Sequence, residues 1–155
     1  MTELMAKWGS NRRQGDIIMS VAEQQEMLGE RKLAHGTMAT AKVTPGRRDF
    51  FSYHDLGVLD ASDGVMKAQI MKATQGLSRP TGWHYHTCES QFVYVVKGWV
   101  DLEFETGEKI RVGEGESLYI PGGLRHNETA TADELEILEV STPGELGTVP
   151  CEAPK

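Results

Sequence analysis

The sequence predicts an all-β domain, built as a sandwich or barrel of short strands. From Arg48 onward, runs rich in β-branched and aromatic residues recur at regular intervals, separated by turn sequences such as Asp63-Gly64 and Thr106-Gly107. No helical periodicity lies between these runs, which is typical of all-β sandwiches and barrels. The strands are expected within residues 49–56, 65–73, 91–98, 99–105, 108–113, 116–121, 126–130 and 135–140.

Length and composition fit one ordinary globular domain. The chain has 155 residues, of which 39% are hydrophobic and 25% are charged. Its formal net charge of −7 argues against nucleic-acid or anionic-membrane partners, which require clustered Lys and Arg. No apolar run reaches the roughly 20 residues of a transmembrane helix, and residues 1–16 lack the apolar stretch of a signal peptide. We therefore expect a cytoplasmic protein.

Three segments differ along the chain. Residues 1–47 form an N-terminal extension, with an expected helix that begins at the capping box Ser20–Glu23; the rest is expected to be disordered or to pack on a neighbouring subunit. Residues 48–143 form the β domain, and the Pro- and Gly-rich residues 144–155 form a surface tail. The two cysteines, Cys88 and Cys151, are too few for a disulfide scaffold.

Two histidines in the stretch "TGWHYHTC" mark the candidate site. His84 and His86 are two residues apart, so on an extended strand their side chains point to the same face, about 6–7 Å apart. Neutral imidazole is a ligand for zinc, iron, copper and nickel, and this spacing lets both rings reach one ion. Taken alone, the pair fits either a metal site or two ordinary core or surface histidines.

The sequence around this pair has the spacing of two longer motifs. The matching positions are His84, His86, Gly98, Gly115, Pro121, Gly123 and His126. The first motif reads G, five residues, H-x-H, three or four residues, E, six residues, G; the second reads G, five residues, P-x-G, two residues, H, three residues, N. These are the motifs of the cupin superfamily, which the chain resembles over most of residues 64–142. The resemblance implies a double-stranded β-helix, a small jelly-roll barrel with a metal ion in its mouth.

The resemblance also implies the metal ligands. By position, His84, His86 and His126 match the three family histidines, and Gln91 stands where the family has a glutamate. The implied cofactor is a divalent transition metal: manganese, iron, nickel, cobalt or zinc. Independently of the resemblance, a tight turn at residues 121–123 can deliver His126 to the pocket of the first pair.

The glutamine changes the chemistry expected of such a site. A neutral amide leaves the ion its full +2 charge, so bound water should be acidified, and an anionic substrate oxygen attracted, more strongly. Because an amide is a poorer ligand than a carboxylate, Gln91 either binds the ion, hydrogen-bonds a bound water, or marks a site that has lost its metal. Two further departures are Ser78, in place of the first glycine, and Ala130, in place of the closing asparagine.

Acid–base candidates lie near the histidines. Glu128 is two residues after His126, so strand parity points it inward, and Tyr119 is a candidate phenol donor. We take Glu128 and Tyr119 as the candidate catalytic residues. Parity places Tyr85 opposite its flanking histidines and Tyr94 opposite Gln91, which favours packing roles for both.

Three functions remain open. The first is a metal-dependent enzyme that acts on a small polar or anionic molecule by Lewis-acid chemistry, as an isomerase, decarboxylase or lyase, or as a dioxygenase. The cupin resemblance covers all of these reactions and includes a methylthio-pentulose-phosphate lyase; the fold does not choose between them. The second function is a module that binds or senses a small molecule, and the third is a purely structural barrel. The resemblance also implies a homodimer that forms through the barrel edges.

Overall fold

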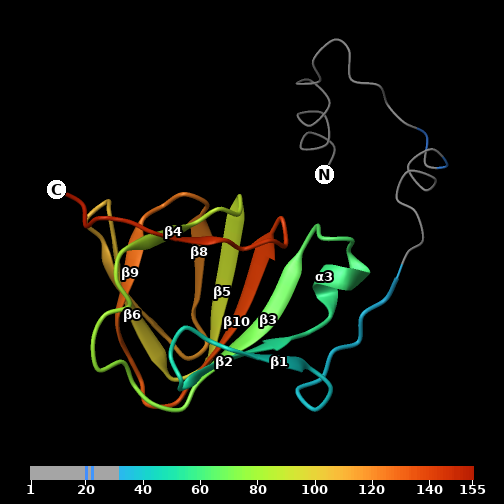
Figure 1. Ribbon diagram of the computed structural model, residues 1–155, viewed down its shortest axis with the longest axis horizontal. Helices are drawn as coiled ribbons and strands as arrows, with labels where there is room; N and C mark the ends of the chain where they lie inside the picture. Colours follow the sequence, from blue (N-terminus) through green and yellow to red (C-terminus); the bar gives the residue numbers. More distant parts are fainter. Residues whose placement is uncertain (1–19, 21, 23–31) are drawn as a thin grey trace, which may run out of the picture. The chain divides into compact units, whose positions relative to one another are not determined.

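The structure, a computed structural model, describes residues 20, 22 and 32–155 (Figure 1). The expected N-terminal helix therefore lies outside the described residues, apart from Ser20 and Ala22. Of the expected N-terminal extension, residues 1–47, the structure describes residues 32–47 as well, and these include a strand, Lys42–Pro45. Residues Lys32–Lys155 form one compact unit. Over the described part of the chain, no helix has the length and apolar character needed to cross a membrane.

Two antiparallel sheets make up this unit. The larger sheet has six strands in the order β1-β2-β3-β10-β5-β8, and the smaller has five in the order β11-β4-β9-β6-β7. The strands are β1 Lys42–Pro45, β2 Phe51–Asp55, β3 Lys67–Ala73, β4 His84–His86, β5 Ser90–Lys97, β6 Trp99–Phe104, β7 Lys109–Gly113, β8 Ser117–Pro121, β9 His126–Thr131, β10 Leu135–Thr142 and β11 Thr148–Pro150. The sheets curve around a common interior (Figure 1), which confirms the predicted all-β jelly-roll barrel.

All eight strands expected from alternation are present, as β2, β3 and β5 to β10. The short helix α3, Val58–Ala61, and the strands β1 and β11 were not predicted from the sequence. These two strands are only four and three residues long and carry no apolar alternation. Both lie outside residues 48–143, the expected limits of the β domain, yet β1 pairs with β2 and β11 pairs with β4.

The core lies between the two sheets and follows from strand alternation. On β5, Gln91, Val93 and Val95 are buried, whereas the residues between them face outward. Burying one such apolar side chain contributes about 1.5–3 kcal/mol, so the inward rows stabilise the barrel. The core cluster contains Met71, Ala73, Val93, Val95, Val100, Leu102, Phe104, Val112, Ile120, Leu135 and Ile137.

The turn between β8 and β9 directs β9 back toward β4. Gly123 has a φ of 78°, a left-handed conformation that favours glycine, and its N–H donates to the carbonyl of His86 at 2.9 Å. At Gly122, a Cβ atom would overlap the backbone carbonyl oxygen of Cys88, so only glycine fits there without displacement. This close backbone contact holds the turn against β4 and sets the position at which β9 begins.

Candidate metal centre

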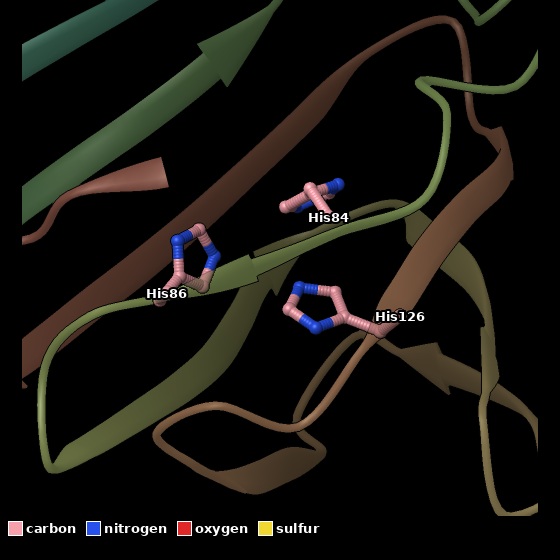
Figure 2. Close-up of side chains that lie close together, drawn as sticks. All are labelled: His84, His86 and His126. Atoms are coloured by element: carbon pink, nitrogen blue, oxygen red, sulfur yellow. The ribbon is translucent and has the colours of Figure 1, made fainter. Parts of the chain in front are cut away.

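Three histidines meet on the inner face of the smaller sheet. His84 and His86 lie on β4, His126 is the first residue of β9, and His84 pairs with His126 across the two strands. Their ligand nitrogens lie within 4.8 Å of one another, and the three rings gather around one space (Figure 2). All three are buried, with exposed fractions of 1%, 9% and 1% in chain order. The turn at residues 121–123 thus brings His126 to the pair, as the sequence predicts.

Backbone carbonyls orient two of the rings. The carbonyl of Gly82 accepts a hydrogen bond from Nδ1 of His84 at 2.8 Å, and the carbonyl of Leu124 accepts one from Nδ1 of His126 at 2.9 Å. Because a carbonyl oxygen can only accept, each Nδ1 carries a proton, and in the neutral ring the lone pair then lies on Nε2. Metal-binding histidines are commonly oriented in this way through their second nitrogen.

Burial favours the neutral form of two of the histidines, His86 and His126. Desolvation, and then the proximity of His126 and His84, lowers the pKa of His86 to about 4. Desolvation is also the main cause that lowers the pKa of His126. Nδ1 of His86 lies 3.2 Å from the hydroxyl of Thr148. Neutral imidazole is the form that binds metals, so the lowered pKa values of His86 and His126 favour binding of an ion at neutral pH.

Two buried atoms at this site have no hydrogen-bond partner among the described residues: Nε2 of His84 and Oε1 of Gln91. Gln91 is 4% exposed and reaches the interior from β5, in the larger sheet. An unsatisfied buried acceptor costs about 1–3 kcal/mol. A bound cation, or water held by it, would satisfy both lone pairs. Three imidazoles and one amide oxygen are a donor set that fits a divalent transition metal.

Glu128 lies beside the histidines and lines the same cavity. Its Oε1 is 3.7 Å from Nε2 of His84, and its Oε2 accepts a hydrogen bond from the hydroxyl of Thr81. Burial by itself raises the pKa of this carboxyl group, but His84, the Thr81 hydroxyl and His126 together lower it below its ordinary value. The inward direction expected from parity is therefore observed, and Glu128 is a carboxylate at neutral pH.

Tyr119, in contrast, is not brought to this site. Its side chain is 60% exposed and lies 3.2 Å from the hydroxyl of Ser90. Strand alternation is the reason, because Ile120 takes the inward position on β8 and is only 4% exposed. Strand parity places Tyr94 on the face of β5 opposite Gln91, and the exposed fractions agree: Tyr94 is 38% exposed and Gln91 is 4% exposed.

Two of the histidines, His86 and His126, line a cavity of about 280 Å³ between the two sheets. Apolar side chains supply much of its lining: Met71, Val93, Val100, Leu102, Ile120, Leu135 and Ile137. Arg47, Lys67, Gln69 and Glu139 also line it, and the sequence analysis did not single out any of these four. A signal existed for Gln69 and Glu139, since each is a polar residue at an inward position of a strand whose other inward residues are largely apolar.

Comparisons with known proteins agree on the family. Residues 73–141 match the family model described as "Cupin domain". The fold is similar to that of KdgF from Halomonas sp., with a TM-score of 0.55 and 23% identity over 72% of this chain and 94% of that chain. It is also similar to the polyketide cyclase RemF from Streptomyces resistomycificus, with a TM-score of 0.59 and 17% identity over 78% of this chain and 88% of that chain. Residues 73–141 therefore carry the match to the cupin family, and the fold of the described residues is the one these proteins share.

One curated relative is the polyketide synthase CurC from Streptomyces cyaneus. It is 30% identical over 99 residues, which cover 61% of this chain and 61% of the relative. The matched segment thus spans about three fifths of that protein's length.

Proposed function

We propose that this protein is a metal-dependent enzyme that acts by Lewis-acid chemistry on a small molecule with an enolisable carbonyl group. One observation carries the proposal: three buried histidines, whose ligand nitrogens lie within 4.8 Å of one another, meet beside the Glu128 carboxylate at a largely apolar cavity. An electron-pair acceptor and a base side by side are what removal of a proton next to a carbonyl requires.

Four residues would hold the metal ion or its bound water. His84, His86 and His126 would hold the ion, and Gln91 would act as a fourth ligand or as the hydrogen-bond partner of a bound water. When bound, a divalent ion supplies a Lewis acid that stabilises negative charge on a substrate oxygen. With three or four neutral ligands, none of the positive charge is cancelled by the protein's own donor atoms.

Glu128 would act as the general base. The Thr81 hydroxyl holds its Oε2, while Oε1 faces the histidine cluster. From there it can accept a proton from the carbon next to the substrate carbonyl and return it to the same or another atom. Return to another atom gives an isomerisation, and attack of the new carbon nucleophile on a second carbonyl gives a ring closure. The apolar lining would hold the hydrocarbon part of the substrate and exclude water from the reacting carbon.

The relatives support a substrate of the polyketide kind. The curated relative is named a polyketide synthase, and one protein of similar fold is a polyketide cyclase. Polyketide chains carry carbonyl groups on alternate carbons, so they are rich in enolisable positions. A cavity of about 280 Å³ lies near the lower end of the range of about 300–1,000 Å³ for small-molecule pockets. It suits one or two rings, or one end of a longer chain.

Metal content tests whether the protein is metal-dependent. Untagged protein should contain about one equivalent of a transition metal per chain by elemental analysis, as expected for one closed cluster of ligands. His126→Ala should lose the metal, whereas Tyr119→Phe, a change at an exposed residue outside the cavity, should retain it. If the wild type takes up none of manganese, iron, cobalt, nickel or zinc after reloading, the metalloenzyme proposal fails. A metal-free binding module then becomes the leading alternative.

Proton exchange tests whether Glu128 removes a proton next to a carbonyl group. The metal-loaded protein should catalyse exchange of the methyl protons of 2′-hydroxyacetophenone in D₂O, followed by NMR. Glu128→Gln should keep its metal and lose about 10²–10⁴-fold of this rate, the usual contribution of a general base. Binding of the ketone without exchange would contradict the enzyme proposal and favour a binding or sensing module.

We also propose a homodimer that forms through the edge of the larger sheet. β8 ends this sheet, and edge strands require cover. Phe92 on β5 and Tyr119 on β8 pair across the outer face, and both are exposed, as are Tyr94 and Val96. Light scattering should give twice the chain mass, and Phe92→Ser combined with Tyr119→Ser should give the monomer. A wild type that is monomeric at all concentrations would contradict the dimer.

A further inference from the structure

A second polar group lies in the cavity wall formed by the larger sheet. Nε2 of Gln69 donates a hydrogen bond to Oε2 of Glu139 at 2.8 Å. Strand register places Gln69 of β3, Glu139 of β10 and Val93 of β5 in one row, and all three line the cavity. The metal-centre histidines belong to the smaller sheet, so the cavity has polar groups on both of its walls.

The fold alone does not require this pair. The inward neighbours of Glu139 along β10 include Leu135 and Ile137, and both are buried apolar residues. None of the ion pairs formed by described residues includes Glu139. Placing a carboxyl group in such surroundings costs free energy that an apolar side chain would not. A costly polar group in a cavity wall, without an ion-pair partner, indicates a role in binding a ligand.

The surroundings of Glu139 favour its protonated form. Burial raises the pKa of Glu139, and the charge of Glu128 adds to this increase. The Gln69 hydrogen bond and the charges of Lys67 and Arg47, which line the same cavity, oppose it without reversing it. Burial, and then the charge of Glu139, raises the pKa of Tyr53 in the same cavity to about 12. This wall therefore offers the Tyr53 hydroxyl and the Gln69 amide as hydrogen-bond donors beside the Glu139 carboxyl group, whereas the opposite wall offers the histidine nitrogens.

We infer that Glu139, held in place by Gln69, binds a second oxygen atom of the substrate while the first oxygen lies at the histidine cluster. This inference rests on the proposed function, and it narrows the substrate class to apolar or aromatic ketones that carry a further hydroxyl or carbonyl group. A carbonyl would accept a hydrogen bond from the Glu139 carboxyl group, and a hydroxyl would donate one to it. Glu139 is thus a residue that determines specificity.

Paired ligands test this assignment. The probes are acetophenone, which has one oxygen, and its 2′-, 3′- and 4′-hydroxy isomers, which have two. Calorimetry on metal-loaded wild type should show at least one isomer binding about tenfold more tightly than acetophenone, the effect of one well-made buried hydrogen bond. In Glu139→Leu this ratio should fall to within twofold, while in Glu139→Gln, which keeps an amide donor and acceptor, part of it should remain. Glu136→Gln, an outward-facing change on the same strand, should leave the ratio unchanged.

The affinity ratios distinguish a Glu139 that binds the second oxygen atom of the ligand from a Glu139 that only fills space in the cavity wall. If Glu139→Leu weakens all four ligands equally, Glu139 only shapes the cavity and the inference is overturned. It is overturned as well if no isomer exceeds acetophenone by more than twofold, or if the protein binds none of them with one metal ion per chain. A protein that takes up no metal contradicts the proposed function instead, and the same ratio, measured without metal, still decides the role of Glu139. Thermal unfolding of each variant shows that it is folded.

Discussion

The side-chain oxygen of Asn127 accepts a hydrogen bond from the N–H of Gly82 at 2.9 Å. The carbonyl of the same glycine accepts the Nδ1 proton of His84, and Nδ2 of Asn127 donates to Glu103 at 2.8 Å. Asn127 is 5% exposed and directly follows His126. One buried amide therefore connects the loop that orients His84 to the strand that carries His126. Nδ1 of His84 and Nδ1 of His126 both bond to backbone carbonyls and not to carboxylates.

Asn127→Ala tests this connection. The change leaves the N–H of Gly82 without its partner, which should reduce the free energy of unfolding by about 1–3 kcal/mol. Loss of such an outer partner should also weaken metal binding by about 10–100-fold, measured by competition with a chelator. Asn127→Asp retains an acceptor for Gly82 and should bind metal more tightly than Asn127→Ala. Wild-type affinity in the alanine variant would show that His84 is oriented without this bond.

Gln91 provides a second test, because its unpaired amide oxygen either contacts the ion or does not. Gln91→Leu should keep the metal on three histidines but bind it roughly tenfold more weakly. Gln91→Glu should bind it more tightly and, because a carboxylate cancels part of the ion's charge, should slow proton exchange of the ketone. Chelator competition and the NMR exchange rate measure the two effects. Unchanged affinity in Gln91→Leu would mean that Gln91 does not contact the ion.

Glu139 makes stability depend on pH in an unusual direction. Because burial raises its pKa in the folded protein above the ordinary value of 4.5, the folded state binds more protons than the unfolded state between these two values. Stability from this group therefore falls as pH rises through that window. Glu139→Gln removes the effect, so the Tm of the variant minus that of the wild type should grow from pH 4 upward and then level off. Scanning calorimetry after chelation measures it, and a difference that is constant with pH would contradict this account.

The turn that carries His126 should be sensitive to a single methyl group. In Gly122→Ala the new Cβ would meet the Cys88 carbonyl, and such overpacking typically costs about 1–3 kcal/mol in free energy of unfolding. Since the turn sets the start of β9, metal affinity should fall as well. Gly113→Ala is the matched control: its Cβ would lie 3.5 Å from a Glu116 oxygen, an ordinary contact, so stability should change by no more than about 0.5 kcal/mol. Equal urea midpoints for the two variants would argue against a tight fit at Gly122.

Local pattern was sufficient to predict most of the barrel and its histidine cluster. Alternation on β5 and β10 is strong, and the motif spacing already relates His84 and His86 to His126. Tyr119 was named a candidate catalytic residue because a phenol can donate a proton, but Ile120 takes the inward position on its strand. The contact between Gln69 and Glu139 joins residues 70 positions apart. It depends on β3 pairing with β10, and no local pattern reveals that register.

The two walls of the cavity differ in origin, because all three histidines come from β4 and β9, whereas Tyr53, Gln69 and Glu139 come from β2, β3 and β10. Gln91 is the one candidate ligand that crosses from the larger sheet. The apolar core is shared by both sheets, since its cluster contains Val93 of β5 and Val100 of β6. The polar residues of the larger sheet's wall, in contrast, can change one at a time while the three histidines stay on their own strands. The same barrel can thus present different polar groups opposite one set of histidines.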